Sequence, residues 1–162
     1  MFKTIVFSEE EVTALQRFAR WRSDPKIETF TPYTNFTEYL YKKEKSYHAH
    51  YLGVAGEFAV ARYLGAFFDP IPRIKGDGHK SDVVWGDDAR IAVKTTRHNP
   101  PIFKITHMRE IEDATDIALC QYNEPVLKIA WIKSKEEFIE NMYLANFGYK
   151  NKFMCLDYKS ND

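Results

Sequence analysis

The chain has 162 residues, of which 44% are hydrophobic and 28% are charged. This composition is typical of a globular protein and excludes disorder over the whole length. The length favours one domain, residues 1–162. Lysine and arginine number 23, as do aspartate and glutamate, so the formal net charge is zero. No global basic field attracts the chain to a polyanion, and any binding to nucleic acid must use a local patch.

The N-terminal residues and the two cysteines bear on the compartment. The apolar run Ile5-Val6-Phe7 is shorter than the roughly 7–15 residues of a signal-peptide core. No stretch approaches the ~20 apolar residues of a membrane-spanning helix. Cys120 and Cys155 each lie in an apolar run, and two cysteines lack the spacing of a zinc site. We expect two reduced core thiols, no membrane association and a cytoplasmic location.

The first half of the chain is predicted to be helical. Ser8 and Glu11 form a capping box, and the apolar spacing after it predicts a helix over residues 8–22. Prolines interrupt the next stretch. A helical pattern resumes near residue 36 and continues to residue 64, where Gly65 is the expected C-cap.

Strand patterns predominate after residue 81. Residues 82–85 and 90–96 flank a Gly-Asp-Asp-Ala turn, which predicts a β-hairpin. The remaining predicted elements are strands over 102–106, 116–122, 126–133 and 153–158, and a helix over 134–144. This order predicts an α/β fold of the α+β style, with one mixed central β-sheet flanked by helices.

Glu57 lies on a face of the predicted helix that consists mostly of small apolar residues. A buried carboxylate needs a cation, a proton or hydrogen-bond donors. Taken alone, Glu57 is explained by an ion pair with an arginine, such as Arg62 or one from elsewhere in the chain.

The predicted hairpin holds two further charged residues. Asp82 opens its first strand, directly after a glycine-rich loop that contains Gly76-Asp77-Gly78. Lys94 lies in the middle of the apolar second strand, on the face that it shares with Ala92 and Thr96. Taken alone, the two are explained by a structural ion pair between adjacent strands.

The order of these features resembles the PD-(D/E)XK nuclease superfamily, specifically its small single-domain phage and bacterial members. The matching segments are Gly53-Val-Ala-Gly56-Glu57-Phe-Ala-Val-Ala-Arg-Tyr-Leu-Gly65, then Gly76-Asp77-Gly78 with Asp82, then Ile91-Ala92-Val93-Lys94-Thr95-Thr96. The pattern over 126–138 is similar to the family's C-terminal half. The resemblance covers residues 47–158. It implies a restriction-endonuclease-like core over 46–158, after an N-terminal helical extension over 1–45.

The resemblance also implies a function, that of a Mg²⁺- or Mn²⁺-dependent endonuclease that hydrolyses phosphodiester bonds in DNA. Asp82 would ligate the metal, the backbone carbonyl of Val93 would be a further ligand, and Glu57 would complete the site directly or through water. Lys94 would position the attacking water and stabilise charge on the phosphate. Many such nucleases act as dimers, so a homodimer is an open alternative. A phage protein would work in the host cytoplasm.

Position 92 departs from the family pattern, which has Asp or Glu two residues before the lysine. Ala92 cannot ligate a metal through its side chain. Three explanations are open: an engineered inactive variant, natural loss of catalysis with a DNA-binding or anti-host protein-interaction role kept, or replacement of the carboxylate by Glu57 or Asp77. We favour the first because every other part of the pattern is present.

Basic residues outnumber acidic ones between Ile71 and Glu110. The candidate DNA contacts near the predicted metal site are Arg73, Lys75, Lys80, Thr96, Arg97 and His98. An ordinary solvated surface is the alternative interpretation of these residues.

Overall fold

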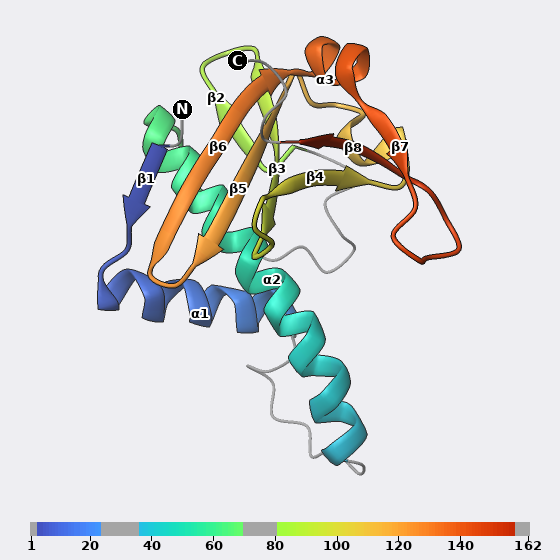
Figure 1. Cartoon of the computed structure of the whole chain (residues 1–162). Coiled ribbons are helices and arrows are strands. Elements are labelled where there is room, and N and C mark those ends of the chain that lie inside the picture. Colours follow the sequence, from blue (N-terminus) through green and yellow to red (C-terminus); the bar gives the residue numbers. More distant parts are fainter. Residues whose placement is uncertain (1–2, 24–35, 70–80, 158–162) are drawn as a thin grey trace.

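Figure 1 shows the computed structural model of the chain, which describes residues 3–23, 36–69 and 81–157, with the backbone alone over 36–46. The elements in chain order are β1 (Lys3–Val6), α1 (Glu9–Ser23), α2 (Phe36–Leu64), β2 (Val83–Trp85), β3 (Ala89–Thr96), β4 (Ile102–Ile105), the 3₁₀ helix η1 (Met108–Ile111), β5 (Asp116–Asn123), β6 (Val126–Ser134), α3 (Lys135–Asn141), β7 (Tyr143–Ala145) and β8 (Phe153–Asp157). The predicted hairpin and both long helices are therefore present.

The central sheet has five strands in the order β1-β6-β5-β3-β2. Strands β3 and β5 are parallel, and the other neighbouring pairs are antiparallel. A parallel pair needs a crossover connection, and here β4 and η1 lie within it. The sheet is mixed, as the sequence predicts.

The two faces of the central sheet are covered by different layers (Figure 1). Helices α1 and α2 cover one face, where Leu15 and Val54 join the apolar cluster that contains Ile91. The other face packs against α3 and a second sheet of order β4-β8-β7. The prediction of a single sheet is therefore wrong. The short strands of the second sheet form because apolar residues such as Phe103 and Leu156 need a surface to pack against.

The N-terminal segment is part of the central sheet and of the core. Strand β1 pairs with β6, and α1 adds Leu15 and Ala19 to the helix-side cluster. The sequence predicts no strand before residue 46, because the four residues of β1 are too few to show a strand period.

Helix ends follow the predicted capping residues at most positions. The Ser8 amide donates to Glu11, and the Glu11 amide donates to Ser8 Oγ. Gly65 has a φ of +67° after α2, the left-handed conformation of a C-cap. Helix α3 is shorter than predicted, because Met142 is extended and the next three residues pair with β8.

Two observations bear on the protein's environment. Cys120 and Cys155 are free and buried, as predicted, and burial raises the pKa of both thiols. Among the described helices, none combines the length and the hydropathy needed to cross a bilayer.

Candidate functional site

Helix α2 packs closely against β3 at Gly56. A Cβ added there would lie 1.9 Å from Thr95 Oγ1 and 3.1 Å from Val93 Cγ1, so only glycine fits. Val93 and Thr95 therefore face α2. Because side chains alternate along a strand, Ala92 and Lys94 face the second sheet.

Glu57, the residue after Gly56, forms an ion pair with Arg22 of α1. Arg22 Nη1 lies 2.8 and 2.7 Å from the two carboxylate oxygens, and Arg22 Nη2 donates to the Asp69 carbonyl at 2.9 Å. An arginine partner for Glu57 was expected, and it is Arg22, since Arg62 pairs with Glu11 instead. The structure thus places Glu57 on the helix-covered side of the sheet, opposite Lys94.

Replacing Arg22 by methionine is expected to lower the free energy of unfolding by about 2 kcal/mol, because Glu57 is only 8% exposed and its carboxylate would lose the cation that compensates its burial. Adding Glu57→Gln to that variant should restore part of the loss. Urea denaturation measures both effects. The control is Arg62→Met, which removes a more exposed ion pair and should change stability by less than about 1 kcal/mol. Equal effects at the two arginines would contradict the structural role of Arg22.

Asp82 holds the open end of the β2–β3 hairpin. Its amide donates to the Ile91 carbonyl at 3.0 Å, and its Oδ2 accepts from the Val93 amide at 2.6 Å. The preceding residue, Ser81, donates to Asp113 through its amide and its hydroxyl. The structure therefore brings Asp82 and Val93 together. Asp113, which the sequence analysis missed, fixes the chain directly before Asp82.

Ala92 is 5% exposed and packs in the apolar cluster with Phe103 and Ile105. Mg²⁺ prefers oxygen ligands in octahedral geometry, and position 92 offers no side-chain oxygen. Glu57 lies on the opposite side of the sheet from position 92. Within the described part of the chain, no group of three or more His, Cys, Asp or Glu residues could hold a metal ion. These residues therefore do not fit a magnesium site as the sequence stands, and Asp77 lies outside the described residues.

Lys94 is held by Glu110, whose role the sequence analysis also missed. Lys94 Nζ lies 3.0 Å from Glu110 Oε2. The other carboxylate oxygen accepts from the Thr106 amide and hydroxyl and from the His107 amide. Partial burial raises the pKa of Glu110, but the Thr106 and Lys94 donors outweigh it and hold the value at about 2. The carboxylate stays charged and fixes the half-exposed ammonium of Lys94.

The Glu110 network should make stability depend on pH. The folded-state pKa of about 2 is below the ordinary value of 4.5, so the stabilisation is complete above pH 4.5 and is lost as the pH falls toward 2. Glu110→Gln should lower the free energy of unfolding by about 2 kcal/mol at pH 7, and the difference from the unaltered chain should shrink below pH 4.5. Urea denaturation between pH 7 and pH 3 tests this.

The matched control is Glu112→Gln, which alters an exposed carboxylate two residues away. It should show no such pH-dependent difference. A difference between Glu110→Gln and the unaltered chain that stays constant over this pH range would contradict the low pKa of Glu110.

The predicted DNA contacts fall into two groups. Thr96, Arg97 and His98 follow one another at the end of β3, where Arg97 and His98 are exposed. Thr96 Oγ1 accepts from the His98 amide, and the buried Gln121 donates to the His98 carbonyl. This turn is therefore held in place. The other predicted contacts, Arg73, Lys75 and Lys80, lie outside the described residues.

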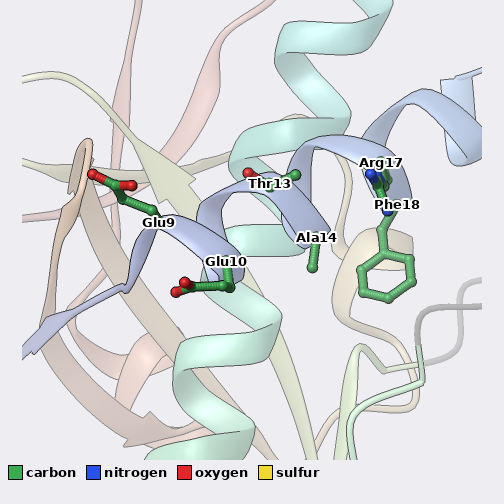
Figure 2. A pocket seen from close by; sticks show the side chains of 6 residues that line it. All are labelled: Glu9, Glu10, Thr13, Ala14, Arg17 and Phe18. Atoms are coloured by element: carbon green, nitrogen blue, oxygen red, sulfur yellow. The ribbon is translucent and has the colours of Figure 1, made fainter.

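A hollow along α1 lies apart from these residues (Figure 2). Its lining consists of Glu9, Glu10, Thr13, Ala14, Arg17 and Phe18. None of the predicted site residues lines it, so it is not the predicted catalytic site.

Comparisons of the chain with protein-family models, curated proteins and solved structures found no match. The functional interpretation therefore depends on the chain's own residues. Among them, Asp82, Val93 and Lys94 lie together on the β2–β3 hairpin, and Glu57 lies on the other side of the sheet.

Proposed function

We propose that this chain is a metal-dependent DNA endonuclease with a restriction-endonuclease-like core, in a form that Ala92 impairs. The observation that supports this most is the β2–β3 hairpin. The Asp82 carboxylate lies 2.6 Å from the Val93 amide, and the next residue on that strand is Lys94. An acidic residue and a lysine so placed supply the charges that phosphodiester hydrolysis uses.

The environment of Lys94 supports a role in binding phosphate. Its side chain is 40% exposed although the three residues before it on β3 are buried, and Glu110 limits its motion. An oriented, accessible ammonium can contact a phosphate oxygen without a large ordering cost. The exposed Arg97 and His98 follow it along the chain and could contact neighbouring phosphates.

Divalent metal would supply the polarisation of the phosphate and the acidification of water in an active form. In the chain as it stands, Asp82 lacks a carboxylate partner at position 92. We therefore expect it to bind DNA in a salt-dependent way without cutting it. In this proposal the protein works in the cytoplasm, in keeping with its free, buried cysteines.

A naturally inactive nuclease fold that binds DNA is the second candidate. It is favoured by the packing of Ala92, which is enclosed by apolar side chains such as Phe103 in a way that suits a small residue. A cleavage assay of one variant distinguishes the two candidate functions. Metal-dependent cleavage by an Ala92→Glu variant supports the endonuclease proposal, whereas DNA binding without cleavage in that variant supports the second candidate.

A further inference from the structure

The outer side of the second sheet presents aromatic rings and lysines together, around the connection between β7 and β8. We call this set the aromatic–lysine surface; it consists of Lys104, Phe147, Tyr149, Lys150, Lys152 and Phe153. Tyr149 is 66% exposed and Phe147 is 39% exposed. Aromatic side chains that are this exposed and lie together are not explained by core packing, and such patches typically mark binding surfaces.

The rings of this surface support one another. Phe153 contacts Phe147 and Tyr149 edge to face, with ring centroids 5.9 and 5.7 Å apart. Lys104 Nζ lies 4.0 Å from the centroid of the Phe147 ring. Phe103 and Ile105, the neighbours of Lys104 on β4, are buried in the apolar cluster between the sheets, so Lys104 lies on the outer side. The rings are thus held in position before any ligand arrives.

The charged residues of the aromatic–lysine surface are all lysines. The segment 141–156 has no acidic residue, and its Lys150 and Lys152 are exposed. Asp157, the next residue, accepts a hydrogen bond from the Tyr143 hydroxyl at 2.7 Å. An anionic partner with flat apolar groups therefore matches the surface in both charge and shape.

We propose that the aromatic–lysine surface binds single-stranded nucleic acid, with bases stacked on Tyr149 and Phe147 and phosphates near the three lysines. Base–aromatic stacking beside a basic track is the usual physical basis of such binding. In a duplex the faces of the bases are stacked on one another, so they are not available to stack on the aromatic side chains. The lysines among the rings break up the continuous apolar area that a protein partner or a lipid surface would cover.

This inference rests on the proposed function only in taking nucleic acid as the ligand, and it does not require cleavage. The test is the affinity for a fluorescently labelled 12-nucleotide oligothymidylate, measured by anisotropy at low salt. Tyr149→Ala and Phe147→Ala should each weaken binding about tenfold, whereas Tyr149→Trp, which keeps a ring, should bind as well as the unaltered chain. The double variant Lys150→Ala, Lys152→Ala should flatten the dependence of log K on log salt concentration.

Tyr63→Ala is the matched control. Tyr63 is 47% exposed on α2 and has Lys3 Nζ at 5.4 Å from its ring centroid, so it resembles the Phe147–Lys104 pair in chemistry but lies on another part of the molecule. It should leave the affinity unchanged. A parallel titration with oligouridylate shows whether the surface accepts RNA as well as DNA, and binding to either supports the inference.

Unchanged affinity in both Tyr149→Ala and Phe147→Ala would overturn the inference, as would failure of the unaltered chain to bind either oligonucleotide. The two proposals fail separately. If Ala92→Glu and Ala92→Asp both stay inert while Tyr149→Ala weakens binding, the endonuclease proposal is overturned and the assignment of the surface stands. If Ala92→Glu cleaves DNA and the surface variants bind normally, the surface assignment alone is wrong.

Discussion

Replacing Ala92 by Glu or Asp is expected to confer Mg²⁺- or Mn²⁺-dependent DNA cleavage, at a rate at least about 100-fold above that of the unaltered chain. Position 92 lies on the same strand and the same face as Lys94. A carboxylate there would supply the oxygen that the described residues lack and would lie near Asp82, which directly precedes the neighbouring strand β2. Cleavage of plasmid, branched and single-stranded DNA, with each metal and with chelator, measures the effect.

The effect of Ala92→Glu can also be measured through the thermal stability of the protein. Ala92 is 5% exposed among apolar side chains, so a carboxylate there should destabilise the metal-free protein by at least about 1 kcal/mol. Metal bound only by the folded state raises stability by mass action. The Tm of Ala92→Glu should therefore fall without metal and rise again with Mn²⁺, whereas the Tm of the unaltered chain should change little.

Two control variants separate catalysis from packing. Ala92→Gln has the size of the glutamate variant without its charge, and it should show neither cleavage nor a metal-dependent Tm. The double variant Ala92→Glu, Lys94→Ala should keep the metal-dependent Tm and lose cleavage. If Ala92→Glu and Ala92→Asp both stay inert on all three forms of DNA, the endonuclease proposal must be abandoned in favour of an inactive, DNA-binding fold.

Local patterns explain why much of the fold could be predicted. Helix α2 is 29 residues long, and its apolar spacing and its terminal Gly65 are both visible in the sequence. The β2–β3 hairpin has a short turn, residues 86–88, between two runs of strand-forming residues. In each case the signal lies within a short stretch of chain, where sequence periodicity is most informative.

The partners of the charged residues depend on tertiary contacts and could not be predicted in this way. Glu57 and Arg22 are 35 residues apart, and Lys94 and Glu110 are 16 residues apart. The alternation of side chains along β3 places Ala92 and Lys94 on one face of the sheet and Val93 and Thr95 on the other. It does not predict which of these faces the helices cover and which the second sheet covers. The second sheet, which covers the Lys94 face, has strands of only three to five residues.

Gly56→Ala is expected to lower the free energy of unfolding by about 3 kcal/mol. The new Cβ would lie 1.9 Å from Thr95 Oγ1 and 3.2 Å from Thr95 Cβ, so α2 would have to move away from β3. The higher helix propensity of alanine offsets at most about 1 kcal/mol of this loss in the free energy of unfolding. Gly53→Ala, three residues earlier in α2, is the matched control. Among the described residues, its Cβ would meet only Glu57 Oε1 at 3.7 Å, so it should stabilise the protein by up to about 1 kcal/mol.

Thr95→Ala should rescue Gly56→Ala, because it removes the oxygen that the new methyl group would strike. Thr95 Oγ1 is buried and finds no hydrogen-bond partner among the described residues, so Thr95→Ala alone should cost little. A double-mutant cycle by urea denaturation should give a coupling energy of at least about 1 kcal/mol between positions 56 and 95. If Gly56→Ala instead stabilises the protein as Gly53→Ala does, α2 does not lie against Val93 and Thr95. The assignment of Glu57 and Lys94 to opposite sides of the sheet would then be wrong, and Glu57 would again be a candidate to replace the carboxylate missing at position 92.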